Sequence, residues 1–215
     1  MLGIEENTRP EAVDEKYLKP IEAHGVATMS MAYLVTDKTP MAWRGPMAAG
    51  ALQQLLPQTQ WGELDILVVD MPPGTGDIQL TLSQKVQVAG AVIVTTPQDI
   101  ALLDAQKGIE MFLKVKIPVL GIVENMAVHV CTECGHAEHV FGDGGGQRVA
   151  ADYGTTLLGS LPLDLSIRQQ GDKGQPLAVA FPDQLIAQQY RNIARSVMAA
   201  LDLMHVDSGP DIEFE

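Results

Sequence analysis

The stretch GAVIVTTPQDIALLDAQKGIEMFLKVKIPVLGIVEN, residues 90–125, decides the fold. Its two ends, residues 90–96 and 118–125, are nearly continuous apolar runs of strand length, which is typical of strands buried on both faces of a parallel sheet. Between them, after Pro97, residues 99–115 have the length and pattern of a helix. Strand, helix and strand in this order predict two parallel strands joined by a crossover helix.

The same alternation extends along the chain in both directions. The apolar run LDILVVD, residues 64–70, predicts another buried strand, and residues 28–35 and 156–161 predict two more. Helices are expected over 46–56, from Asp77 onward, over 147–153 and over 183–202, whereas residues 1–20 are read as loop. The pattern therefore predicts an α/β fold with a doubly wound, mostly parallel sheet, built as a single domain over residues 1–203 and followed by an acidic tail, 204–215.

Composition restricts the possible classes of function. The chain has 215 residues, 46% of them hydrophobic, and a formal net charge of −13. Such a negative charge disfavours binding to nucleic acid or to an anionic membrane surface. No apolar run approaches the roughly 18–20 residues of a membrane-spanning helix, and the first residues do not show a basic segment followed by an apolar one. These features favour the cytoplasm, with no membrane partner.

The two cysteines of the chain, Cys131 and Cys134, form the sequence CTECGH. Two thiolates at this spacing supply half of a four-thiolate metal site, and Gly135 suits the tight turn because glycine adopts a positive φ at low cost. Three interpretations remain open. The pair could bridge two subunits around an iron–sulfur cluster or zinc, it could bind zinc within one chain with a nearby histidine, or it could be a reduced or disulfide-forming pair. The histidines near the pair are His129, His136 and His139.

A second candidate site follows the predicted strand 64–70. Its sequence, DMPPGTGD, places Asp70 at the carboxyl end of a strand, where ligands bind in open α/β sheets and where an acid can hold Mg²⁺. Backbone N–H groups of the glycine-rich loop can approach a phosphate, and the helix that follows favours anions. The alternative interpretation is an ordinary strand-to-helix turn that Asp77 caps.

From about Lys19 to Leu201 the chain resembles the Mrp/ApbC family of iron–sulfur cluster carrier proteins, a branch of the MinD/ParA-like P-loop ATPases. The resemblance covers more than four-fifths of the chain and rests on five ordered stretches. These are WRGPM (43–47), LDILVVDMPPGTGDIQLTL (64–82), VIVTTPQDIALLDAQKGI (92–109), VLGIVENM (119–126) and CTECGH (131–136).

The resemblance implies a nucleotide site and a cluster site. It implies binding of ATP and Mg²⁺, with Asp70 as the acid near the metal and with Asn125 and the segment around Pro162 contacting adenine. It also implies a loop that senses the γ-phosphate, formed by Gly74, Thr75 and Gly76. Cys131 and Cys134 would bind a [4Fe–4S] cluster across a homodimer axis, with zinc as a possible occupant after purification, and the cluster would pass to recipient apoproteins.

One feature departs from the family pattern. The family places a GKGGVGKS-like P-loop before the region seen here, and these 215 residues contain no G-x-x-x-x-G-K-[ST] sequence. Without that cradle for the phosphates, ATP hydrolysis is not expected of this chain alone. The sequence is therefore interpreted as an amino-terminally shortened member. The alternatives are a zinc-stabilised, non-catalytic interaction module of the same fold and a MinD/ParA-like partitioning ATPase.

Overall fold

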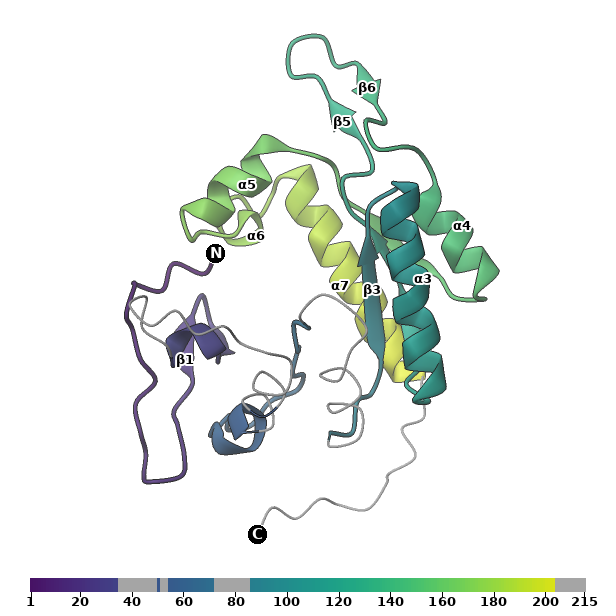
Figure 1. Cartoon of the computed structure of the whole chain (residues 1–215). Helices are drawn as coiled ribbons and strands as arrows, with labels where there is room; N and C mark the ends of the chain where they lie inside the picture. Colours follow the sequence, from purple (N-terminus) through teal and green to yellow (C-terminus); the bar gives the residue numbers. More distant parts are fainter. Residues whose placement is uncertain (35–49, 51–53, 72–85, 204–215) are drawn as a thin grey trace. The chain divides into compact units, whose positions relative to one another are not determined.

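The computed structural model describes residues 1–34, 50, 54–71 and 86–203 (Figure 1). The described residues fall into two compact units, with the boundary between Gln87 and Val88. Each unit is considered by itself, and the prediction of a single domain over 1–203 stays a prediction.

The second unit contains a three-stranded parallel sheet in the order β3-β4-β7. Its strands are β3 (Ala91–Thr95), β4 (Val119–Glu124) and β7 (Leu157–Ser160). Ile93 lies opposite Ile122 in the first pair, and Ile122 lies opposite Leu157 in the second. The strands predicted at 90–96, 118–125 and 156–161 are thus confirmed, as is the parallel α/β arrangement.

Helices cover both faces of this sheet (Figure 1). The core on one face joins the strands to α3 (Asp99–Lys114) and α4 (Gly145–Asp152), with Ile109 and Ile122 almost wholly buried. The core on the other face joins β4 and β7 to α7 (Leu185–Leu203) through Val123 and Leu158. Because successive strand residues point to opposite faces, Ile122 and Val123 serve different cores. Each fully buried side chain of this size contributes about 1.5–3 kcal/mol to folding.

The crossover helix α3 shows why the sequence predicted it so closely. Its buried residues Leu102, Ala105 and Ile109 recur at helical spacing and face the sheet. Asp99 lies in the first turn and Lys114 in the last, and both charges complement the helix dipole. The predicted range of 99–115 differs from the observed helix by one residue.

The first unit begins with a short hairpin in which β1 (Ile21–Ala23) pairs antiparallel with β2 (Val26–Thr28). The strand predicted at 28–35 is wrong for residues 29–34, because a 3-10 turn, η1 (Met31–Tyr33), follows instead. The hydroxyl of Ser30 accepts a hydrogen bond from the Ala32 N–H and thereby caps this turn. A serine cap therefore overrides the apolar pattern.

The strand predicted at residues 64–70 is also wrong in this structure. These residues take no strand conformation, and Val68 is 84% exposed. An apolar run becomes a buried parallel strand only when neighbouring strands supply backbone partners and covering helices. Among the described residues no strand pairs with this run. The apolar pattern alone therefore does not make these residues a strand.

Some predictions fall on residues that the structure does not describe. These are most of the helix at 46–56, the helix from Asp77, the loop Gly74-Thr75-Gly76 and the tail 204–215. Residues 54–58 are helical, in agreement with the end of the first of these helices. None of the helices formed by the described residues is long and apolar enough to cross a membrane.

Four further elements were not predicted. A hairpin of β5 (His129–Val130) and β6 (Ala137–Glu138) projects from the second unit and carries the cysteines (Figure 1). Helices α5 (Leu165–Asp172) and α6 (Leu177–Ala180) connect β7 to α7. Asp164 caps α5 by accepting a hydrogen bond from the Ser166 N–H. The observed helices α4 and α7 confirm the predictions at 147–153 and 183–202 within two residues.

Candidate functional site: the cysteine hairpin and the strand ends beside it

The cysteine sequence forms the turn of the β5–β6 hairpin. His129 lies opposite Glu138, and the next pair is Val130 with Ala137. Beyond that pair the Cys131 N–H donates to the carbonyl of His136 at 2.9 Å. The Gly135 N–H returns to the carbonyl of Cys131, also at 2.9 Å, and Gly135 has a φ of 72°. The turn expected from the sequence is confirmed, including the positive φ at its glycine.

Both thiols are free and accessible. Cys131 is partly exposed and Cys134 is exposed. Hydrogen bonds from the backbone N–H groups of Cys134 and Glu133, and from the Cys134 side chain, lower the pKa of Cys131. Donors directed at a sulfur favour its thiolate form, which is the form that binds metal. The hairpin turn is therefore built to present a thiolate.

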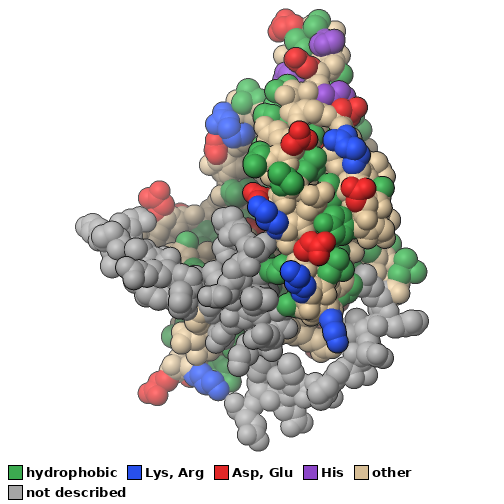
Figure 2. Space-filling view, turned by 45° about the vertical axis from the view of Figure 1, so that its right-hand side comes forward, with side chains coloured by type: hydrophobic (Ala, Val, Ile, Leu, Met, Phe, Trp, Pro, Cys, Tyr) green, Lys and Arg blue, Asp and Glu red, His purple; other side chains and the backbone are tan. Residues whose placement is uncertain are grey.

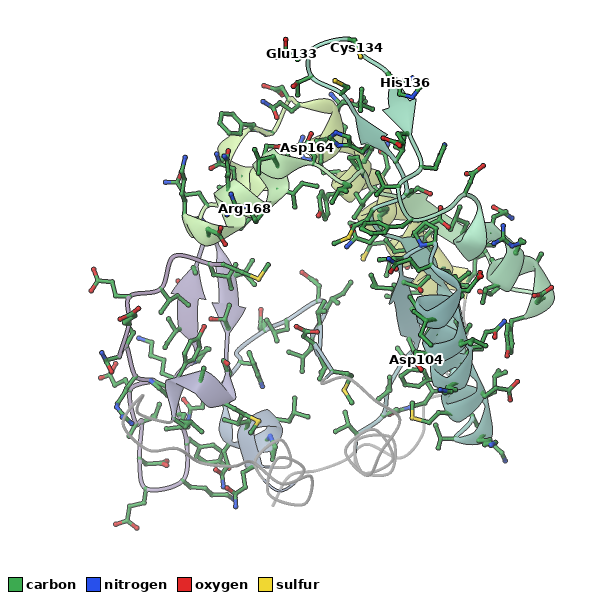
Figure 3. The ribbon with its side chains drawn as sticks, turned by 45° about the horizontal axis from the view of Figure 1, so that its top comes forward. Asp104, Glu133, Cys134, His136, Asp164 and Arg168 are labelled. Atoms are coloured by element: carbon green, nitrogen blue, oxygen red, sulfur yellow. The ribbon has the colours of Figure 1, made fainter. Side chains whose placement is uncertain are left out.

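The outer end of the hairpin is polar, and no described element of the second unit packs against it. Figure 3 shows Glu133, Cys134 and His136 together at this end, with Asp164 at the beginning of α5 and Arg168 farther along that helix. Figure 2 shows the histidines of the hairpin gathered on the part that projects from the molecular surface. A second molecule can thus approach the thiols without displacing part of this unit.

Two of the three histidines brace the hairpin. The Nδ1 atom of His129 lies 3.1 Å from the carbonyl of Leu163, and the Nδ1 atom of His139 lies 2.8 Å from the carbonyl of Ala127. Each ring thereby fixes its tautomer and orientation against the backbone. Among the described residues no group of three or more His, Cys, Asp or Glu side chains is placed to hold a metal ion. Within one chain the hairpin offers two thiols.

The predicted adenine contacts lie at the base of the hairpin. The Asn125 N–H donates to the carbonyl of Thr95 at 2.7 Å, and the Asn125 side-chain oxygen accepts from the Met126 N–H at 3.0 Å. Pro162 follows β7, which is paired with β4, so both residues lie at the carboxyl ends of neighbouring parallel strands. This is the edge where α/β sheets bind ligands.

Backbone hydrogen bonds continue the pairing of β4 and β7 into the loops. The Leu161 N–H donates to Glu124, the Ala127 N–H to Leu161 and the Leu163 N–H to Val128, all at 2.8–2.9 Å. The segment that leads to Cys131 is therefore hydrogen-bonded to the segment that contains Pro162. The structure brings together Asn125, Pro162 and the base of the hairpin that carries Cys131 and Cys134.

The structure does not test the roles of the other predicted residues. Asp70 belongs to the first unit and is exposed. Gly74, Thr75 and Gly76 lie outside the described residues. Their roles at magnesium and at a phosphate stay predictions.

Glu124 is a residue that the sequence analysis missed. It is the last residue of β4 and only 4% exposed, and its carboxylate accepts a hydrogen bond from the Gly146 N–H at 2.5 Å. The signal was present in the sequence, since a glutamate interrupts the apolar run VLGIVEN at its end. Buried acids almost always have a specific partner or role.

The arrangement of the second unit defines the class of protein. A parallel sheet covered on both faces, with candidate site residues after its strands, is the pattern of the P-loop NTPase-like α/β proteins. The chain is similar to a solved nucleotide-binding protein from Archaeoglobus fulgidus in complex with ADP, with a TM-score of 0.64 and 36% identity over 76% of this chain and 64% of that one. It also shares its fold with the cell division ATPase MinD from Pyrococcus furiosus, with a TM-score of 0.54 and 20% identity over 70% and 58% of the two chains.

Within that class the family can be stated. The family model described as ParA, NUBPL iron-transfer P-loop NTPase, matches residues 1–198, and the chain belongs to this family. It is 65% identical to the iron-sulfur cluster carrier protein of Pseudomonas fragi over 90% of this chain and 68% of that protein. It is 57% identical to the Escherichia coli K12 protein of the same name, over 94% of this chain and 54% of that protein. Identity to the mouse iron-sulfur cluster transfer protein NUBPL is 49% over 89% and 60%. The chain thus spans between about half and two-thirds of these relatives.

Proposed function

We propose that this protein is an iron–sulfur cluster carrier that binds its cargo through Cys131 and Cys134. The observation that carries the proposal is the exposed hairpin turn, in which backbone N–H groups favour the thiolate of Cys131 beside a second free thiol. Relatives that match nine-tenths of the chain are named as cluster carrier proteins.

The cargo in this proposal is a [4Fe–4S] cluster shared by two copies of the chain. Such a cluster takes four thiolates, and one chain supplies two. A twofold axis at the hairpin would bring four cysteines together from two identical turns. The exposed position of the turn supports this arrangement. Zinc could occupy the same four thiolates.

A nucleotide site completes the proposal. Asn125 and Pro162 would contact adenine at the strand ends, because the hydrogen bond from the Met126 N–H fixes the Asn125 oxygen and leaves its NH₂ group to donate to a base. In the complete site Asp70 would hold Mg²⁺, and Gly74, Thr75 and Gly76 would approach the γ-phosphate. ATP binding and hydrolysis would then be tied to cluster transfer.

Recipient apoproteins are the proposed partners, and the cytoplasm is the proposed location, where two unpaired thiols stay reduced. The net charge of −13 disfavours nucleic acid as a partner.

Anaerobic reconstitution with iron and sulfide tests this function. The expected product holds about one four-iron cluster per two chains and passes it to an apoprotein that requires four-iron clusters. Cys131→Ser and Cys134→Ser should each abolish uptake, because either change removes two of the four ligands from a symmetric site. His136→Ala is the matched control in the same turn and should leave uptake intact.

Two results would overturn the proposal. Uptake that survives both cysteine substitutions would place the cargo elsewhere. One zinc ion per monomer that is lost in His136→Ala would instead establish the zinc-stabilised interaction module.

A further inference from the structure

The cysteine hairpin belongs to a segment whose two ends meet at one side chain. Residues 125–144 run from the end of β4 to the beginning of α4 and include both cysteines. Glu124 immediately precedes this segment, and Gly146 lies just after it, in the first turn of α4. The hydrogen bond from the Gly146 N–H to the Glu124 carboxylate therefore closes the segment into a loop at its base.

The first turn of α4 is shaped to meet this carboxylate. A side chain at Gly146 would place its Cβ 3.0 Å from the Cβ of Glu124 and 3.1 Å from its Oε2. A Cβ at Gly145 would lie 2.7 Å from Leu102 and 3.0 Å from the carbonyl of Pro97. Two glycines thus let the helix approach the ends of β3 and β4 closely enough for the Gly146 N–H to reach the acid.

The electrostatics of the contact favour an acid over a neutral residue. The first N–H groups of a helix lack partners within the helix and carry a partial positive charge. Gly144 has no side chain with which to cap α4, so the Glu124 carboxylate takes that part from the neighbouring strand. A buried acid without such a partner would be strongly unfavourable.

The backbone of Glu124 is also bound to the neighbouring loop. Its carbonyl accepts from the Leu161 N–H at 2.9 Å, one residue before Pro162. From there, hydrogen bonds between 127–129 and 161–163 reach the beginning of β5. Glu124 is therefore hydrogen-bonded both to the beginning of α4 and to the loop that contains Pro162. It also directly precedes Asn125 in the chain.

We propose that Glu124 is a positioning residue whose carboxylate clamps the base of the 125–144 segment and holds the cysteine hairpin in a fixed relation to the strand ends at Asn125 and Pro162. The clamp is present in the chain without any bound cargo. Its consequence for the cargo, slower loss of a bound cluster, rests on the proposed function.

Hydrogen exchange of the full chain without cargo tests the clamp. In Glu124→Ala, the amides of residues 127–139 and of the first turn of α4 should exchange about tenfold faster than in the unchanged protein, because local opening of the segment becomes easier. The middle of α3 should be unaffected. Glu124→Gln keeps an oxygen that accepts the Gly146 N–H, so it should restore most of the protection.

Two further variants separate the clamp from a general loss of stability. Gly146→Ala keeps Glu124 but adds a Cβ 3.0–3.1 Å from its Cβ and Oε2, so the carboxylate must shift against the N–H that it accepts from. This variant should reproduce the selective effect on the hairpin. Leu158→Ala removes a buried side chain from the opposite face of the sheet and should speed exchange throughout the second unit, without selectivity for the hairpin. Wild-type protection of the hairpin in both Glu124→Ala and Gly146→Ala would overturn the proposal, as would an equal effect in all four variants.

Cluster release gives the second readout. After reconstitution, Glu124→Ala should lose its cluster about threefold faster to a chelator, because a hairpin that opens more often holds its two thiolates less steadily in the geometry that the cluster needs. Equal release rates in the two proteins would refute the consequence for the cargo. If the unchanged protein takes up no cluster, the proposed function fails, and the exchange experiment still decides whether Glu124 is a clamp.

Discussion

At the scale of single residues, the chemistry of the cysteine turn depends on where backbone N–H groups point. The hydrogen bonds that Cys131 receives from residues 133 and 134 require the chain to turn back at Gly135. A cysteine outside such a turn would meet water and would not gain these donors. The tight turn after Cys131 is therefore the main cause of its lowered pKa, and the Cys134 side chain adds a smaller contribution.

The lowered pKa of Cys131 can be measured by its rate of alkylation. The thiolate is the reactive form, so a lower pKa moves the rise of the iodoacetamide rate to lower pH. Cys134→Ser isolates Cys131 and keeps both backbone donors. The folded variant should therefore reach half of its maximal rate at lower pH than the same variant unfolded in urea. Coincident pH profiles in the two states would show that the turn does not stabilise the thiolate.

At the scale of elements, a strand or helix could be predicted from the sequence when the elements that pack against it lie in the same segment. The unit of β3, α3 and β4 was predicted within about a residue, because its apolar spacing, its end charges and its partner strands all lie in 90–125. The run at 64–70 has the same apolar character but was wrongly predicted, because its strand state depends on neighbours from elsewhere. A run of apolar residues indicates a buried strand only where neighbouring strands and helices are present to pack against it.

The site was predictable to a similar degree. Cys131, Cys134 and the positive φ of Gly135 followed from spacing and residue type. Asn125 and Pro162 were identified through the family resemblance, and the structure places both at the carboxyl ends of neighbouring strands. Glu124 was missed because a hydrogen bond between residues 22 positions apart leaves no periodic signal in the sequence.

Close packing of elements at glycines gives a prediction for stability. At Gly121, in β4, a Cβ would lie 2.5 Å from Leu158 and 2.7 Å from the carbonyl of Thr156, and φ is 156°. Gly121→Ala should lower the free energy of unfolding by about 1–3 kcal/mol through overpacking and backbone strain. Gly108, in α3, has nothing within 4 Å of the same position. Gly108→Ala should raise the free energy of unfolding by about 0.5–1 kcal/mol, since alanine favours the helix.

Urea denaturation of the two glycine variants checks both signs. A Gly121→Ala protein as stable as the unchanged one would mean that β4 and β7 do not approach as closely as the structure has them. If the free energy of unfolding falls in Gly121→Ala and rises in Gly108→Ala, the two changes cannot come from a general effect of added alanine.

At the scale of the whole molecule, nucleotide affinity depends on contacts that are distributed along the family sequence. Asn125 and Pro162 would contribute contacts to adenine, but no G-x-x-x-x-G-K-[ST] sequence occurs in these 215 residues to cradle the α- and β-phosphates. This chain should therefore bind Mg·ATP weakly. Isothermal titration checks this expectation, with an intact P-loop ATPase as the positive control, and micromolar affinity for this chain would contradict it.

The assembly of two molecules should be linked to the metal they share. If the cluster draws two thiolates from each chain, it binds the dimer and not the monomer, so loading it must raise the dimer fraction and removing it must favour monomers. Light scattering of the reconstituted protein, before and after anaerobic chelation, should show the mass fall from two chains toward one. Cys134→Ser is the control and should stay monomeric under both conditions, because it leaves only two thiolates in a symmetric pair. A mass that is unchanged by chelation would show that dimerisation does not depend on the metal. One tightly bound metal ion on a monomeric chain would refute the shared site.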